Sequence, residues 1–497
     1  MRTAYSVDTV RTAERALMAR LPEGALMKRA AAGLATVCAE LLGKVYGSRV
    51  VLVVGSGDNG GDALYAGARL ARRGAGVVAV LLDPERAHAA GLAALLAAGG
   101  RVAGAGERVM DRADLVVDGI VGIGGRGGLR ESALPFVRAA LESSAVVVSV
   151  DLSSGVDADT GEVAGEAVRA DVTVTFGAYK PGLLIDPARE YAGAVRFVDI
   201  GLDFGGAAGG ELGGEPGDGS GAELGGGASM LEALQHDDVA RLLPVPTGES
   251  DKYRRGVVGI VAGSARYPGA AVLAVAGALH GGAGAVRYVG PAAGAVVSRF
   301  PETLVSEGAP GKAGRVQAWV AGPGLGDDAS RLADVLAADV PVLIDADGLR
   351  LADAEAVRGR GAPTLLTPHA GEAAALLGVP REEVEAQRLA AVRELAERYR
   401  ATVLLKGSTT LVAGPGGGPV RVNPTGTAWL ATAGSGDVLS GLAGSLLAAG
   451  LGALDAGSVA AYLHGLAARR VSHGAPVAAQ DVAGGIPGAW ADVRREA

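Results

Sequence analysis

The chain has 497 residues, of which 49% are apolar and 20% are charged, and its net charge is −8. This apolar fraction excludes disorder along the whole chain, and the negative charge argues against a nucleic-acid-binding protein. A single cysteine, Cys38, excludes both a disulfide framework and a cysteine-based zinc site.

The N-terminus and the hydropathy favour a cytoplasmic protein that does not enter a membrane. Residues 1–10 carry Arg2 and Asp8 and lack the apolar core of a secretory signal. The mean hydropathy of +0.29 raises the question of a membrane span. However, the longest uncharged stretch, residues 267–286, contains a proline, a histidine and several glycines, so we expect a buried helix beside a strand.

A glycine-rich segment divides the chain. Residues 205–227 read GGAAGGELGGEPGDGSGAELGGG, which is about half glycine with a few acids. Such a segment cannot bury enough apolar surface to offset the entropy lost on ordering. We therefore expect a domain over residues 1–203, a flexible linker over 204–230 and a second domain over 231–497.

Both parts alternate apolar β-branched runs with helical periodicity. This pattern predicts an α/β fold, with a mostly parallel sheet covered by helices on both faces, and a Rossmann-like three-layer α/β/α domain in the first part. There we expect helices at 8–42 and 62–73, and strands at 50–54, 77–82, 115–117, 146–150, 172–176 and 195–198. In the second part we expect strands at 257–262, 286–289, 318–321, 340–344, 364–366 and 402–405, and helices at 270–280, 382–399, 437–449 and 456–470.

The first expected strand ends in the loop GSGDNGGD, residues 55–62, which opens a helix. The spacing fits the G-x-G-x-x-G turn of dinucleotide-binding proteins. However, Asp58 and Asp62 flank the helix N-terminus, where they would repel a pyrophosphate. Acids at this place suit a cation, a ribose hydroxyl or proton transfer; a purely structural turn is the alternative.

Two further loops of the first part carry an aspartate at a strand end. Asp118 precedes a glycine-rich loop at 119–128, and Asp151 begins the segment DLSSGVDADTG. Since ligands of open α/β sheets bind outside the carboxyl ends of the strands, we expect the three loops to meet at one site. Asn59, Asp118 and Ser154 supply hard oxygens that suit an alkali or alkaline-earth cation.

These motifs, with the run NGGDALYAGARL, resemble the NAD(P)H-hydrate epimerases along the first part of the chain. The resemblance implies interconversion of the R and S forms of hydrated NADH and NADPH (NADHX and NADPHX), with Asp151 as a catalytic residue. It implies a potassium site at Asn59, Asp118 and Ser154. The substrate-binding residues that it implies are Asp58, Asn59, Gly60, Gly61, Asp62, Gly122, Ile123, Gly124, Gly125, Arg126, Gly127 and Gly128. The chain departs from the family at Asp58, where asparagine is usual, and at Ser153, where proline is usual.

The second part places polar loops after several strands. GPGLG follows one strand, Asp345-Ala346-Asp347 the next, and TPHAGE, which contains His369 and Glu372, another. A structural histidine and a helix-capping glutamate are the alternatives to a site here. The segment KGSTT, residues 406–410, offers an ammonium and hydroxyls suited to phosphate, although its glycine spacing excludes a P-loop.

The segment TAGSGDVL, residues 432–439, is the sharpest signal of the second part. Its glycines expose successive amides at a helix N-terminus, which predicts an anion hole. We expect the helix dipole to keep Asp437 ionised, so that this carboxylate can accept the proton of a substrate hydroxyl. Helix capping alone is the alternative.

The GSGD segment resembles the ribokinase-like superfamily, and the ordered motifs GS-x-x-YPGA, GPGLG, D-A-D, TPHAGE, LKGSTT and TAGSGDVLSG resemble the NAD(P)H-hydrate dehydratases. The resemblance implies a ribokinase-like α/β domain that uses ADP and Mg²⁺ to dehydrate the S form, giving AMP and phosphate. It implies Asp437 as the catalytic residue. The implied contacts to the hydrated dinucleotide are Ala270, Gly324, Gly326 and His369, and those to the nucleotide are Lys406, Gly407, Ser408, Thr409, Thr410 and Gly436.

Two other functions fit parts of this pattern. The GSGD chemistry alone permits a small-molecule kinase fused to a dinucleotide-binding regulatory module, and the first part alone permits a non-enzymatic interaction module. We also expect a homo-oligomer. Only six of the 46 basic residues are lysine, so lysines are expected where a guanidinium cannot replace a compact ammonium; Lys180, Lys252 and Lys406 lie in or near the motifs.

Overall fold

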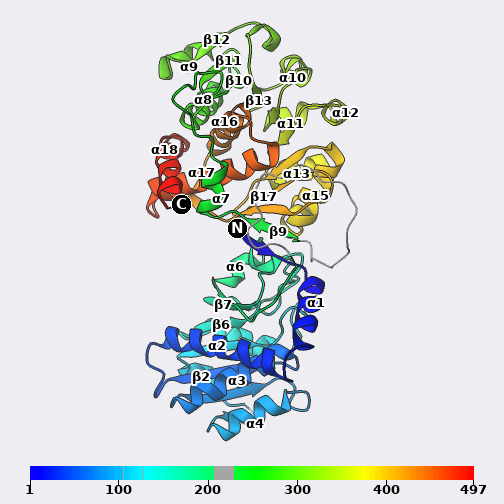
Figure 1. Ribbon diagram of the computed structural model, residues 1–497, viewed down its shortest axis with the longest axis vertical. Helices are drawn as coiled ribbons and strands as arrows, with labels where there is room; N and C mark the ends of the chain where they lie inside the picture. Colours follow the sequence, from blue (N-terminus) through cyan, green and yellow to red (C-terminus); the bar gives the residue numbers. More distant parts are fainter. Residues whose placement is uncertain (105, 126, 206–228, 497) are drawn as a thin grey trace. The chain divides into compact units, whose positions relative to one another are not determined.

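The computed structural model describes residues 1–104, 106–125, 127–205 and 229–496 (Figure 1). The chain forms two compact units, Thr3–Met230 and Leu231–Ala497, and Met1–Arg2 belongs to the second unit. Most of the expected linker, residues 206–228, lies outside the described residues. Across the described part of the chain, no helix is both long enough and apolar enough to cross a membrane.

The N-terminal unit is built on a seven-stranded sheet of order β4-β3-β2-β5-β6-β7-β8, in which all neighbours are parallel. The strands are β2 Arg49–Val54, β3 Gly76–Leu81, β4 Arg101–Val102, β5 Leu115–Gly119, β6 Val146–Val150, β7 Val172–Phe176 and β8 Ala194–Val198. The helices are α1 Val7–Met18, α2 Ala25–Leu42, α3 Asp58–Arg72, α4 Ala89–Ala97, α5 Leu134–Glu142 and α6 Arg189–Ala192, with 3₁₀ turns η1 Val109–Arg112 and η2 Pro181–Leu183.

Helices cover both faces of this sheet, as the valine-rich strands predict. On β2, Leu52 packs into a cluster with Leu34 of α2 and Leu64 of α3. The neighbouring Val51 and Val53 point the other way, into a cluster that includes residues of η1 and α5. Successive side chains of a strand alternate between faces, so apolar residues at every position require cover on both sides. The three-layer α/β/α architecture is confirmed.

The C-terminal unit is built on an eleven-stranded sheet of order β1-β9-β18-β17-β16-β15-β14-β13-β10-β11-β12. The strands are β1 Arg2–Ala4, β9 Leu231–Ala233, β10 Val257–Val261, β11 Ala285–Val289, β12 Leu304–Ser306, β13 Ala318–Ala321, β14 Val342–Ile344, β15 Thr364–Leu366, β16 Thr402–Leu405, β17 Thr410–Ala413 and β18 Val420–Asn423. From β16 through β15, β14, β13, β10 and β11 to β12, each neighbouring pair of strands is parallel. Strand β17 is antiparallel to both β16 and β18, and β18 is parallel to β9.

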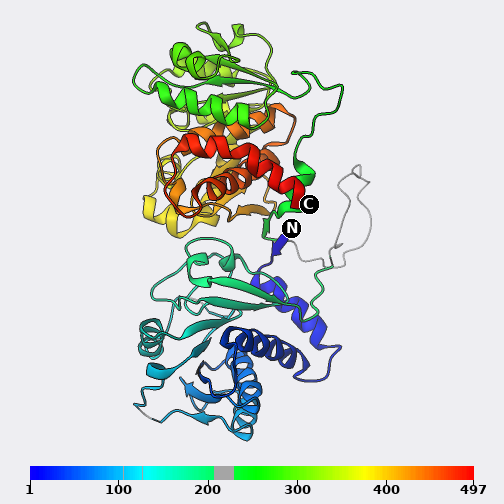
Figure 2. The same ribbon diagram turned by 90° about the vertical axis from the view of Figure 1, so that its left-hand side faces the viewer.

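Helices α8, α16, α17 and α18 pack together over this sheet (Figure 2). The helices of the unit are α7 His236–Leu242, α8 Pro268–His280, α9 Ala293–Arg299, α10 Ala329–Leu336, α11 Asp347–Leu351, α12 Ala354–Arg358, α13 Ala370–Leu377, α14 Arg381–Ala386, α15 Arg388–Tyr399, α16 Ser435–Ala448, α17 Ala453–Ser472 and α18 Ala479–Glu496. Two 3₁₀ turns, η3 Pro310–Lys312 and η4 Ala428–Leu430, complete it.

Two expected helices are each divided in the structure. The pattern at 8–42 forms α1 and α2, separated by a turn that contains Pro22 and Gly24. Gly24 adopts a φ of +71° at the start of α2, a conformation that glycine tolerates. The pattern at 382–399 forms α14 and α15, which are separated at Gln387. In both cases the apolar periodicity continues across a change of chain direction.

The closest helix contact of the C-terminal unit joins α8 and α16, and it depends on glycine. A Cβ atom at Gly441 would lie 1.9 Å from the carbonyl oxygen of Ala274, and one at Gly277 would lie 2.1 Å from that of Val438. Atoms cannot approach so closely, so a side chain at either place would push the helices apart. Because α16 begins at the GSGD segment, this contact also fixes the position of that segment.

We predict that Gly441→Ala destabilises the C-terminal unit by about 1–3 kcal/mol, the usual cost of overpacking. The control is Gly484→Ala in α18, where a Cβ would meet nothing within 4 Å; it should stabilise the unit by up to about 1 kcal/mol, because alanine favours helix. All three tryptophans lie in this unit, so urea unfolding followed by tryptophan fluorescence reports on it alone. Equal effects of the two substitutions would contradict the close contact.

Candidate active sites

A cavity of about 1410 Å³ lies at the carboxyl ends of β2, β5 and β6 in the N-terminal unit. The three loops singled out in the sequence therefore do meet at one place. The predicted residues that line the cavity are Asp58, Asn59, Asp62, Gly122, Ile123, Gly124, Gly125, Gly128 and Asp151. Among the described residues predicted to bind substrate here, Gly60, Gly61 and Gly127 do not line it, and Arg126 lies outside the described residues.

Gly60 and Gly61 have a packing role in the structure. A Cβ at Gly60 would lie 2.3 Å from the carbonyl oxygen of Gly55, and one at Gly61 would lie 2.9 Å from Cε of Met27. Glycine at these positions lets the start of α3 fold tightly against the end of β2 and against α2. Gly60 and Gly61 therefore support the cavity without lining it.

Asp118 is fully buried and is held by four hydrogen bonds. Oδ2 accepts from the Ser149 hydroxyl at 2.8 Å and from the Ser154 amide at 2.9 Å, and Oδ1 accepts from the Ser154 hydroxyl at 2.6 Å and the Ile120 amide at 3.3 Å. Burial raises the pKa of Asp118, and these hydrogen bonds oppose the shift. The side chain orients the loops after β5 and β6 toward each other.

Oxygen atoms gather beside Asp118. The hydroxyl of Ser154 lies 2.6 Å from Asp118 Oδ1 and 3.0 Å from the carbonyl oxygen of Val121. One hydroxyl proton can satisfy only one of these two acceptors. Asn59 donates its amide to the carbonyl of Val150, and a Cβ at Gly122 would lie 2.3 Å from its Oδ1. This donor set of carboxylate, hydroxyl and carbonyl oxygens suits a hard cation.

Asp151 is buried beside an ammonium that the site prediction did not include. Its Oδ1 accepts hydrogen bonds from Lys180 Nζ, from the Thr175 hydroxyl at 3.0 Å and from the Phe176 amide at 3.2 Å. Lys180 is only 1% exposed and also donates to Thr175 and to the Phe176 carbonyl. Asp151 has a φ of +65°, an uncommon conformation for a residue other than glycine. The ion pair fixes the orientation of the carboxylate at the cavity wall.

Two other acids of this cavity have raised pKa values. Asp62 is 7% exposed, and its pKa is raised well above the usual value, first by burial and then by Asp151, Asp58 and Glu14. Burial, followed by Asp151, also raises the pKa of Glu14 on α1. No sequence motif points to Glu14, because it lies on a separate helix before the first loop.

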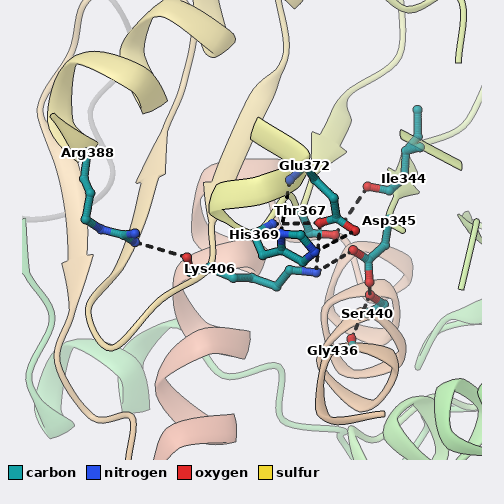
Figure 3. Close-up of polar contacts among 9 residues, drawn as sticks. All are labelled: Ile344, Asp345, Thr367, His369, Glu372, Arg388, Lys406, Gly436 and Ser440. Carbon is teal, nitrogen blue, oxygen red and sulfur yellow. Dashed lines mark hydrogen bonds and ion pairs between the residues drawn. The ribbon is translucent and has the colours of Figure 1, made fainter. Parts of the chain in front are cut away.

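The second site lies at the ends of β14, β15 and β16, where Lys406 meets two acids (Figure 3). Lys406 Nζ lies 2.7 Å from Asp345 Oδ1 and 3.7 Å from Glu372 Oε2. Asp345 is nearly fully buried, and its Oδ2 accepts a 2.6 Å hydrogen bond from Ser440 on α16. Burial opposes the charge of Lys406, but Asp345 and Glu372 more than compensate and raise its pKa.

His369 and Glu372 form a capping box at the start of α13 (Figure 3). The Glu372 amide donates to His369 Nδ1 at 3.1 Å, and the His369 amide donates to Glu372 Oε2 at 2.8 Å. The pair therefore caps α13, which is the structural role that the sequence left open as an alternative. However, the His369 side chain is 59% exposed, so its ring is also accessible to a ligand.

Asp437 lies in the first turn of α16, after Gly434, which has a φ of +89°. Burial and the nearby Asp345 raise the pKa of Asp437 to about 7, while Lys406 opposes the shift. The expectation that the helix dipole keeps this group ionised is therefore wrong in direction. Asp345 lies far away in the sequence, so the repulsion could not be seen there. A carboxyl with a pKa near 7 is suited to accept and release a proton near neutral pH.

The remaining predicted residues of this unit lie in loops or at the starts of α8, α16 and β17. A Cβ at Gly324 would lie 2.7 Å from Cβ of Ala270, and the Gly326 amide donates to Asp347 at 2.9 Å. A Cβ at Gly436 would lie 3.5 Å from Lys406 Nζ, so these two predicted nucleotide contacts are neighbours. In the loop after β16, Gly407 and Ser408 are exposed, Thr410 is half-buried and Thr409 is fully buried.

The nucleotide loop is supported by Arg388 on α15, which no motif identified. Its guanidinium donates to the carbonyls of Lys406 at 3.1 Å and Thr409 at 2.9 Å. A Cβ at Gly407 would lie 2.4 Å from this guanidinium, which explains the glycine of the LKGSTT motif. Arg388 thus holds the loop that carries Lys406.

Two family models match the chain, one in each unit. Residues 23–182 match the family described as YjeF-related protein N-terminus, and residues 258–486 match the family described as NAD(P)H-hydrate dehydratase. A solved structure of an ADP/ATP-dependent NAD(P)H-hydrate dehydratase from Bacillus subtilis, co-crystallised with ATP and Mg²⁺, is 29% identical. It covers 52% of this chain and 97% of its own, with a TM-score of 0.48.

Relatives that match both units are more similar. The bifunctional NAD(P)H-hydrate repair enzyme Nnr of Mycobacterium tuberculosis is 50% identical over 461 residues, which cover 91% of this chain and 90% of the relative. The protein of the same name from Mycobacterium leprae is 49% identical and covers 94% of both chains. On this identity and coverage, the chain belongs to the family of bifunctional NAD(P)H-hydrate repair enzymes.

Proposed function

We propose that this protein repairs hydrated NADH and NADPH with two activities. The N-terminal unit interconverts R- and S-NAD(P)HX, and the C-terminal unit dehydrates the S form with ADP, giving NAD(P)H, AMP and phosphate. The observation that carries the proposal is the presence of two separate strand-end sites, around Asp151 and Asp437, on one chain of this family. The dehydratase acts on the S form, and the epimerase converts the R form into the S form.

The dehydratase site supplies a base at the reacting hydroxyl. Hydration leaves a hydroxyl at C6 of the nicotinamide ring, and hydroxide is a poor leaving group. In the proposed reaction Asp437 accepts the hydroxyl proton while the oxygen takes the β-phosphoryl group of ADP, which releases AMP. Loss of phosphate from C6 and of a proton from C5 then restores the ring double bond. Backbone amides at the start of α16, around Gly436, stabilise the phosphate charge.

Lys406 is placed to hold the nucleotide phosphates, with its orientation fixed by Asp345 and Glu372. Among the described residues, no group of three His, Cys, Asp or Glu side chains forms a metal cage. These residues therefore suit a Mg²⁺ ion carried mainly by the phosphates, the usual arrangement for this cation. When bound, Mg²⁺ would neutralise phosphate charge.

In the epimerase unit we propose that K⁺ is held by Asn59, Asp118 and Ser154, together with the carbonyl of Val121. The oxygen atoms around the Ser154 hydroxyl, which share one proton, support this assignment. A bound K⁺ would offset the buried charge of Asp118 and stabilise the glycine loop after β5, which lines the cavity.

We further propose that the epimerase domain spans residues 1–203, a linker spans 204–230 and the dehydratase domain spans 231–497. We propose a cytoplasmic location, which suits the free and buried Cys38, since thiols stay reduced there. The predicted homo-oligomer stays a prediction.

A reciprocal pair of variants tests the two-site proposal. Asp151→Asn should slow R/S interconversion by about 10²–10⁴-fold and leave ADP-dependent dehydration of the S form unchanged, and Asp437→Asn should do the reverse. Chromatography of the two epimers and of NADPH measures both reactions, and circular dichroism checks that each variant is folded. Loss of both activities in either folded variant would contradict two independent sites.

The raised pKa of Asp437 predicts the pH dependence of dehydration. A base must be ionised to accept a proton, so kcat/KM should rise with pH up to about 7 and then level off, because the carboxyl titrates at about 7. The residual activity of Asp437→Asn should lack this rise. A flat wild-type profile from about pH 5 to pH 8 would show that this carboxyl is not the base.

Replacement of K⁺ by tetramethylammonium should slow interconversion, because this larger cation cannot enter a site of closely spaced oxygens. In Asp118→Ala, interconversion should be slow, and excess K⁺ should restore part of the rate, because the remaining ligands still bind the cation with lower affinity. The epimer ratio against time measures the rate, after subtraction of spontaneous epimerisation. An identical wild-type rate in both salts would argue against the cation site.

A further inference from the structure

Asp62 is a buried acid that faces the epimerase cavity without a hydrogen-bond donor for one of its oxygens. It lies in α3, lines the cavity and is 7% exposed. Its Oδ1 is buried and finds no hydrogen-bond partner among the described residues. An ionised carboxylate left in this state is strongly disfavoured against the neutral acid. Asp62 is therefore held as a carboxylic acid that carries a proton into the cavity.

The charges around Asp62 act in the same direction. After burial, the largest causes of its raised pKa are Asp151, Asp58 and Glu14, all of them acids. The charged or titratable groups that line the cavity together with Asp62 have both signs; they are Arg11, Glu14, Arg15, Glu23, Lys28, Asp58, Tyr65, Asp83, His88, Arg130 and Asp151.

Asp151 in the same cavity has the hydrogen-bond donors that Asp62 lacks. Its Oδ1 accepts hydrogen bonds from the Lys180 ammonium, the Thr175 hydroxyl and the Phe176 amide. The cavity thus contains one carboxyl with an unpartnered buried oxygen and another held by an ammonium and two further donors. Enzymes divide acid and base roles between two like groups by such differences in environment.

We propose that Asp62 is the proton donor and Asp151 the proton acceptor in the interconversion of R- and S-NAD(P)HX. This inference rests on the epimerase function proposed above and assigns a catalytic role to Asp62, in place of substrate binding alone.

The step follows from the chemistry of C6, which carries both the hydroxyl and the ring nitrogen N1. Asp151 takes the hydroxyl proton, and the electron pair of the O–H bond forms the C6=O double bond. The C6–N1 bond breaks, its electron pair moves to N1, and Asp62 gives N1 its proton. The resulting aldehyde rotates about the C5–C6 bond.

Ring closure reverses each transfer on the opposite face of the aldehyde. The N1 electron pair forms the new C6–N1 bond, the N1 proton returns to Asp62, and the oxygen recovers its proton from Asp151. The two carboxyls end as they began, and no oxidant, reductant or water is consumed. The only change is the configuration at C6.

The test compares Asp62→Asn with Asp58→Asn across pH. Asp58→Asn makes the same side-chain change at an exposed position four residues earlier on the same helix. In the wild type, interconversion should fall at alkaline pH as Asp62 ionises. Asp62→Asn should lose about 10²–10⁴-fold in rate and lack the alkaline fall, whereas Asp58→Asn should keep it, even if its KM changes.

Three results would overturn the assignment. The first is an Asp62→Asn rate within a few-fold of wild type, and the second is an alkaline fall that persists in Asp62→Asn. The third is the absence of an alkaline fall in the wild type, which can be measured without any variant. Asp62→Glu, which keeps a proton donor, should retain the alkaline fall if Asp62→Asn does not fold. Dehydration of the S form by the same preparations checks the rest of the chain. A wild-type protein that does not interconvert the epimers at all would instead refute the proposed epimerase function.

Discussion

Each unit pairs a lysine with a buried aspartate that follows a parallel strand, and both candidate sites depend on this pairing. Lys180 holds Asp151 after β6, and Lys406 holds Asp345 after β14. A buried charge is tolerated only when it is paired and hydrogen-bonded, so each pair fixes the strand-end loops around it. Among the described residues, Asp62 in one unit and Asp437 in the other make no ion pair of their own, and their pKa values are raised. Each site thus contains one acid held by a lysine and a second acid with a raised pKa.

Much of this arrangement is visible in the sequence because parallel strands buried on both faces read as continuous apolar runs. The expected strands 146–150, 172–176, 318–321, 364–366 and 402–405 have the bounds observed for β6, β7, β13, β15 and β16. Strands β1, β4, β9, β12, β17 and β18 were missed; four of them, β1, β4, β9 and β18, contain a charged residue that interrupts the apolar pattern. The scarcity of lysine pointed to Lys180 and Lys406, which prove to be paired inside the sites, and also to Lys252, which is exposed.

What the sequence could not show is which distant groups share a site. Glu14 and Arg388 lie on helices outside the motifs, and Ser440 was given no role within its motif. The three residues nevertheless approach Asp62, the Lys406 loop and Asp345, respectively. Asp437 was expected to respond to the dipole of its own helix, whereas burial and Asp345 determine its pKa. Local patterns therefore predicted the positions of the reactive groups, and the protonation of those groups depends on contacts made by the fold.

In the proposed function, one chain converts both epimers of a hydrated cofactor into the usable form. The direct measurement is to incubate the wild-type protein with a mixture of R- and S-NADPHX, with and without ADP and Mg²⁺, and to resolve the products by chromatography. With ADP, both epimers should disappear faster than the R form epimerises spontaneously, and AMP should form in equal amount to NADPH. Without ADP, only interconversion should occur. An R epimer that persists at its spontaneous rate, or a stable phosphorylated hydrate in place of NADPH, would contradict the proposed function.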